Sequence, residues 1–143
     1  MKYTVEATIN RPISQVVELY NDPSNHIKWM PGILSHQITS GNRREPATES
    51  TFKFKVNGRD FIIKETIIKN DSTEIVAEFI SNGAINTQVT QFSKIDDDST
   101  SYKVNESFEL KGFMKVIGIL MPGSFKKQTK QFVEAFKGFS ENQ

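Results

Sequence analysis

Apolar and polar residues alternate along most of the chain before Leu110. Residues 2–9 show the pattern clearly, with Tyr3, Val5 and Ile9 set between polar neighbours, which is the period of a strand with one buried face. Similar segments follow, separated by turn residues, and we expect further strands at 34–40, 48–56, 60–69, 74–81, 85–95 and 101–110. The pattern therefore predicts a first strand followed later by an antiparallel meander.

The connections between these segments agree with that order. Asn57-Gly58 is typical of a two-residue hairpin, because both central residues of a type I′ turn need positive φ. Residues 13–20 carry a short apolar helical face that ends before Pro23, since the residue before a proline is disfavoured in a helix. Residues 24–30 are followed by the turn pair Pro31-Gly32, and we expect another short helix there.

After the last predicted strand the apolar residues follow a helical period. One stripe runs through residues 113–139, made of Met114, Ile117, Met121, Phe125, Phe132, Phe136 and Phe139. Pro122-Gly123 interrupts this stretch, and an internal proline kinks a helix. Because the stripe keeps its phase across the break, we treat it as one long kinked helix on which the sheet closes. Two separate helices are the alternative.

Composition narrows the classes of function. The 18 basic and 17 acidic residues give a net charge of +1, so no overall field attracts nucleic acid or an anionic membrane, and we expect Lys126, Lys127 and Lys130 to form a solvated helix face. Without cysteine there is no disulfide, thiolate catalysis or thiolate metal site. No stretch reaches the roughly 18 apolar residues of a membrane span, and the first residues alternate like a strand rather than a signal peptide. We expect a single cytoplasmic domain over 1–143, without nucleic-acid partners or integral membrane association.

Two carboxylates interrupt the apolar side of the predicted strands. Glu65 continues the alternation of Ile63, and Glu106 continues that of Val104. Burial of an unpaired carboxylate is costly and usually raises its pKa. Each of these acids is therefore either paired, solvated by a pocket, or at work as a proton donor, proton acceptor or ligand anchor. Glu65 and Glu106 are the candidate catalytic residues.

The order of elements and motifs at both ends resemble the START-like helix-grip (SRPBCC) superfamily, closest to its polyketide cyclase/dehydrase-like branch. The first strand, proline turn and first helix of that family match residues 5–23, Trp29 and Pro31 stand where it often has these residues, and 132–137 resembles its closing helix. The resemblance spans the chain. It implies an α+β helix-grip fold, with a curved seven-stranded antiparallel sheet wrapped around a long C-terminal helix in the order β-αα-ββββββ-α.

The resemblance also implies a cavity between sheet and helix for a small hydrophobic molecule such as a lipid, polyketide or isoprenoid, with no cofactor. Two alternatives remain open within the superfamily: a polyketide cyclase/aromatase-like enzyme that uses an inward carboxylate, or a protein-interaction module of the chaperone-ATPase-activator type. The expected ligand contacts are Trp29, Phe54, Ile63, Glu65, Phe79, Val89, Gln91, Tyr102, Glu106, Met114, Ile117 and Met121. In this fold Trp29 is expected to cluster with the last three near one end of the cavity.

His26 and His36 are the only histidines, and neither has a companion at metal-ligand spacing. We expect them at the surface or the cavity rim, with His36 facing inward if its apolar neighbours Leu34 and Ile38 do. No metal site is predicted. Residues 41–47, which include two arginines and a proline, are expected to form a longer mobile loop.

Overall fold

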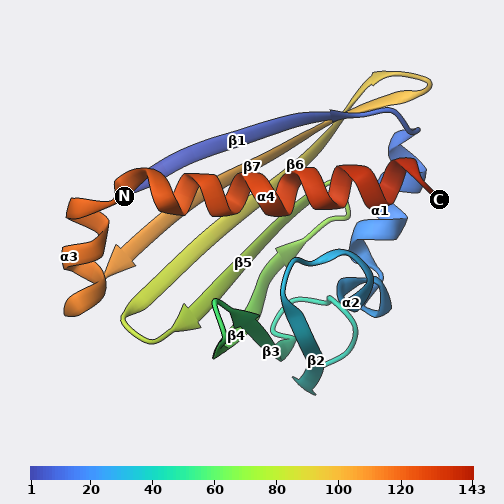
Figure 1. Cartoon of the computed structure of the whole chain (residues 1–143). Coiled ribbons are helices and arrows are strands. Elements are labelled where there is room, and N and C mark those ends of the chain that lie inside the picture. The colour runs from blue at the N-terminus through green and yellow to red at the C-terminus, as the bar shows by residue number, and fades with distance from the viewer.

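Figure 1 shows a computed structural model, which describes all residues from 1 to 143, with the last helix lying across one face of an antiparallel sheet. The strands are β1 (Lys2–Ile9), β2 (Ile33–Ser40), β3 (Glu49–Val56), β4 (Arg59–Asn70), β5 (Glu74–Ser81), β6 (Ala84–Asp96) and β7 (Ser99–Leu110). The helices are α1 (Ile13–Asn21), a 3-10 turn η1 (Pro23–Asn25), α2 (His26–Trp29), α3 (Phe113–Leu120) and α4 (Pro122–Glu141). None of the helices is long and apolar enough to cross a membrane.

The seven strands form one sheet in the order β1-β7-β6-β5-β4-β3-β2. β2 to β7 form a meander, and β1 joins the sheet by pairing with β7. We call the face that α4 covers the inner face. The predicted helix-grip fold is confirmed, with an open sheet whose edges are β1 and β2.

The hydrophobic core is concentrated under the C-terminal half of α4, where α1 and α2 close one end of the domain (Figure 1). Phe136 is fully buried there, with its ring 5.1 Å from the rings of both Tyr20 and Trp29 and 5.4 Å from that of Tyr102. Aromatic groups bury large areas and gain further from edge-to-face contact at such distances. This cluster fixes the position of α4 on the sheet.

At the opposite end of the strands, the inner face is less well covered. Phe61 is 47% exposed, and Phe79 and Phe108 are only partly buried. The ring of Phe125, from α4, meets that of Phe108 at 5.1 Å. Apolar side chains of the inner face are therefore accessible to solvent at this end and not at the other.

The final helical stripe is divided between two helices, so the prediction of one element over 113–139 is wrong and the alternative of two helices is confirmed. α3 ends at Leu120 and α4 begins at Pro122, while Met121 between them has φ −134° and ψ 57°. A residue before proline avoids helical angles, and proline suits a first helical turn because it has no N–H to leave unpaired. α3 therefore lies beside the start of α4 rather than extending it (Figure 1).

Because the two ends of the inner face are packed unequally, shortening a phenylalanine side chain should cost different amounts of stability at each end. Phe136→Ala should lower the free energy of unfolding by about 3–5 kcal/mol, because it leaves a cavity among rings that cannot collapse into it. Phe113→Ala is the matched control, since this phenylalanine is 75% exposed and should change stability by only about 0.5 kcal/mol. Urea denaturation followed by circular dichroism measures both values. Similar losses in the two variants would contradict this assignment of the core.

Candidate functional site

Glu106 lies on the inner face of β7, opposite Gln88 of β6 in the strand pairing. Its Oε1 accepts a hydrogen bond from Gln88 Nε2 at 2.9 Å and another from Thr129 Oγ1 of α4 at 3.3 Å. Its Oε2 is buried and has no hydrogen-bond partner. One oxygen of this carboxyl is thus fixed by sheet and helix together, while the other is buried without a hydrogen bond within 3.5 Å, although the Asn86 side chain lies near the carboxyl.

The surroundings of Glu106 favour its neutral form. Burial raises the pKa of Glu106 above its ordinary value of 4.5, although hydrogen bonds from neighbouring amides and a hydroxyl partly oppose this. Tyr3 Oη lies 2.8 Å from Thr129 Oγ1, and burial raises the pKa of Tyr3 to about 12. Because a threonine hydroxyl has one proton, Thr129 can donate to Glu106 only while accepting from Tyr3. A carboxyl held in this way can offer a proton to a carbonyl or hydroxyl oxygen.

β6 turns polar residues toward α4, so the predicted inward orientation of Val89 and Gln91 is wrong. The buried positions of this strand are its even-numbered residues, including Thr90 and Phe92. Apolar side chains occur at both the even-numbered and the odd-numbered positions of β6. The aromatic ring of Phe92 determines that the even-numbered positions face inward. Phe92 packs against Tyr102 at 5.1 Å, which forces Val89 and Gln91 to the outer face.

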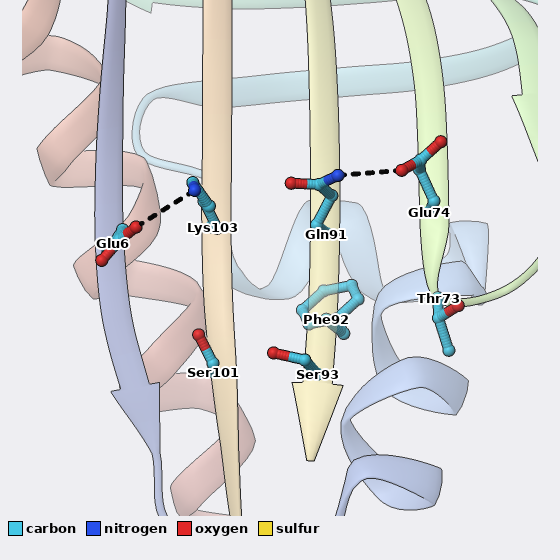
Figure 2. Close-up of a pocket in the computed structure, with 8 residues that line it drawn as sticks. All are labelled: Glu6, Thr73, Glu74, Gln91, Phe92, Ser93, Ser101 and Lys103. Carbon is cyan, nitrogen blue, oxygen red and sulfur yellow. Dashed lines mark hydrogen bonds and ion pairs between the residues drawn. The ribbon is translucent and has the colours of Figure 1, made fainter. Parts of the chain in front are cut away.

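Figure 2 shows that Gln91 belongs to a polar row on the outer face. Gln91 Nε2 donates to Glu74 Oε2 at 2.8 Å, and Lys103 Nζ lies 3.5 Å from Glu6 Oε1. The hollow here has a volume of about 440 Å³, but only one of the 8 residues that line it is hydrophobic. Its charged and amide groups are paired with one another, so this face offers little to an apolar guest.

A second polar cluster occupies the inner face near α2. Arg44 Nη1 is 3.6 Å from Glu65 Oε2 and 3.1 Å from His26 Nε2, and the side chains of Arg44 and Glu65 are only 7% and 4% exposed. Ser50 Oγ donates to the other oxygen, Glu65 Oε1, at 3.0 Å. Both oxygens of Glu65 therefore have partners in the protein, and this carboxylate acts as the counter-ion of Arg44.

Arg44 is the inner-face residue that the sequence reasoning missed. We expected residues 41–47 to be a mobile loop, but the Arg44 side chain is buried with its guanidinium 5.4 Å from the centre of the Tyr20 ring. Its carbonyl oxygen accepts from Asn70 Nδ2 at 3.0 Å, which ties the loop to β4. Glu65 was the sequence signal that could have indicated a buried arginine. An inward carboxylate needs a counter-ion, and the loop before β3 holds two arginines.

The two histidines lie side by side, and His26 is buried, contrary to the expectation that both lie at the surface or the cavity rim. Their ring centres are 4.7 Å apart, and His26 is buried with its ring stacked on Phe52. Burial, with the adjacent Arg44 guanidinium, lowers the pKa of His26 to about 3, so this imidazole is neutral and accepts from Arg44. The structure contains no group of three or more acidic, histidine or cysteine side chains that could hold a metal.

The other predicted ligand contacts divide between the two ends of α4. Phe54, Ile63 and Phe79 lie on the inner face, and Tyr102 lies in the packed core. Trp29 packs beneath the C-terminal half of α4, whereas Met114, Ile117 and Met121 belong to α3 or its end, beside the start of α4 (Figure 1). The structure therefore does not bring Trp29 together with these three residues, because the expected cluster assumed a single final helix.

Comparison with solved structures shows the same fold in proteins of little sequence identity. A START superfamily protein from Mycobacterium smegmatis is 14% identical with a TM-score of 0.84, over 99% of this chain and 97% of that one. The Zhui aromatase/cyclase from Streptomyces sp. R1128 is 11% identical with a TM-score of 0.84, over 99% and 93%. Norcoclaurine synthase from Thalictrum flavum, in complex with dopamine and hydroxybenzaldehyde, is 16% identical with a TM-score of 0.71, over 97% and 85%.

A comparison with curated proteins finds no significant match. The family model for polyketide cyclase / dehydrase and lipid transport proteins matches residues 1–137. This family supports hydrophobic ligand binding or cyclase chemistry as the general class of function. Since the match covers nearly the whole sequence, the chain belongs to the polyketide cyclase/dehydrase and lipid transport family.

Proposed function

We propose that the protein binds a small hydrophobic molecule, such as a lipid, polyketide or isoprenoid, between the inner face of the sheet and the first half of α4. The observation that carries this proposal is the carboxyl of Glu106. Its Oε2 is buried without a partner, while its Oε1 is fixed by Gln88 and Thr129. A buried oxygen without a hydrogen bond is costly, and a polar atom of a ligand would remove that cost.

The walls around this carboxyl suit an apolar guest. Phe61, Phe79 and Phe108 are partly exposed residues of the inner face, and the ring of Phe125 from α4 lies 5.1 Å from that of Phe108. Covering apolar surface contributes roughly 25 cal/mol per Å² removed from water, so a guest lying on these rings gains affinity from burial alone. A few polar groups among apolar walls then fix its orientation, as in most small-molecule sites.

Enzymatic turnover is a second candidate function, favoured by one observation. The raised pKa of Glu106 suits a general acid, which can donate a proton to a carbonyl oxygen of a polyketide-like chain during cyclisation. Glu65 does not suit this role, because Arg44 and Ser50 occupy its oxygens. The Zhui aromatase/cyclase has the same fold, so this architecture is compatible with cyclase chemistry.

Neighbouring residues of β5 test where the guest lies. Phe79 points to the inner face and Ile80 to the outer face, where Ile80 is 44% exposed. Titration with the fluorescent probe N-phenyl-1-naphthylamine should show binding to the folded protein, weakened about tenfold by Phe79→Ser through lost apolar contact. Ile80→Ser should leave the probe affinity unchanged. Equal weakening by both variants, or no binding by the unaltered protein, would exclude this site.

The pH dependence of the free energy of unfolding tests the raised pKa of Glu106. Because its folded-state pKa lies above its unfolded value, the stability contributed by the neutral carboxyl is fully present below about pH 4.5 and is lost as the pH rises through the folded pKa. Glu106→Gln cannot ionise and should therefore gain stability relative to the unaltered protein between pH 4 and pH 8. Urea denaturation across this range measures the difference. The control is Glu109→Gln on the exposed face of β7, and a parallel trend in that variant would refute the assignment.

A further inference from the structure

α3 presents an apolar surface to solvent. Four of its apolar residues and the residue that follows the helix are between 47 and 75% exposed: Phe113, Val116, Ile119 and Leu120 in α3, and Met121 after it. At about 100° per residue, the first four lie on one side of the helix. We call these five residues the α3 patch. Apolar side chains are scattered singly over most protein surfaces, whereas a group confined to one short helix marks an interaction site.

The opposite side of α3 holds the helix firmly against the domain. A Cβ on Gly118 would lie 2.5 Å from Leu110 Cδ1, and one on Gly83 would lie 2.9 Å from Met114 Cγ. The glycine in the helix thus allows a close approach to β7, and the glycine in the β5–β6 turn makes room for the methionine. Because this side is already used for docking, the α3 patch faces away from the sheet and cannot fold back into the core.

The chain around the α3 patch is positively charged. Residues 111–133 contain five lysines and no aspartate or glutamate, although the whole chain has a net charge of only +1. Lys115 lies on α3 itself, and Lys126, Lys127 and Lys130 are exposed on the first turns of α4, beside α3. The acidic neighbour of Lys111 is Glu109, at 3.9 Å, and both are 68% exposed, so solvent weakens this pair.

We propose that the α3 patch docks the protein on an anionic lipid bilayer. The apolar side chains enter the boundary between headgroups and acyl chains, and the surrounding lysines contact anionic headgroups. A lipid surface fits this combination better than a second copy of the chain, because apposed α3 patches would bring like-charged lysines together. The proposal goes beyond ligand binding and does not depend on it, since vesicle binding requires no guest between sheet and helix.

Flotation with lipid vesicles tests the apolar part of the proposal. The protein should float with vesicles of phosphatidylcholine containing phosphatidylglycerol, float less at high salt, and remain unbound with phosphatidylcholine alone. Phe113→Ser combined with Leu120→Ser should reduce binding at least tenfold, since two apolar side chains no longer leave water. The control is Ile62→Ser, an outer-face residue 59% exposed on β4, which should bind like the unaltered protein.

The absence of cysteine permits a direct test of the orientation. A single Leu120→Cys substitution labelled with the environment-sensitive dye NBD should show a blue shift and a gain in intensity with phosphatidylglycerol vesicles. The same label at Ile62→Cys should not change. Equal binding to neutral vesicles, equal responses of the two labels, or no binding at all would overturn the proposal. Dimerisation through the α3 patch would also overturn it. In that case light scattering would show a dimer that the serine substitutions convert to a monomer, and the protein would not bind vesicles.

Discussion

The packing of Phe136 against the sheet is the interaction on which the remaining geometry depends. Tyr20, Trp29 and Tyr102 surround its ring from α1, α2 and β7, so one side chain joins three separate parts of the chain to α4. With its C-terminal half fixed there, α4 reaches over the rest of the inner face without needing an equally dense contact along its whole length. The first half of the helix can therefore leave apolar rings of the sheet accessible, which is the arrangement that a binding protein needs.

The inner face also carries more polar groups than an ordinary core. Arg44 and Glu65 neutralise one another at one position, whereas Glu106 at another is held by neutral donors and keeps one oxygen unpaired. These two carboxylates differ because one has a buried cation beside it and the other has none. The same sheet thus contains a buried ion pair and a carboxyl whose pKa is raised by burial.

Much of the architecture could be predicted from the sequence because strand alternation and turn residues are local properties. The strand order, the hairpins and the inward side of β3 and β5 follow from them. Three features escaped this reasoning for physical reasons. β6 has apolar residues in both alternations, so only the tertiary contact of Phe92 with Tyr102 selects its inner face. Pro122 is compatible with a kink or with a new helix, and helical phase alone does not distinguish them. Arg44 was missed because a loop residue carries no periodicity.

The buried ion pair between Arg44 and Glu65 restricts which substitutions this chain tolerates at the two positions. The arginine comes from the loop before β3 and the carboxylate from β4, so two segments distant in sequence share one desolvated contact. Loss of either partner alone leaves an unpaired buried charge, which lowers the free energy of unfolding by about 3–5 kcal/mol. A replacement of the loop before β3 therefore has to keep a cation at position 44 or be accompanied by a neutral residue in place of Glu65.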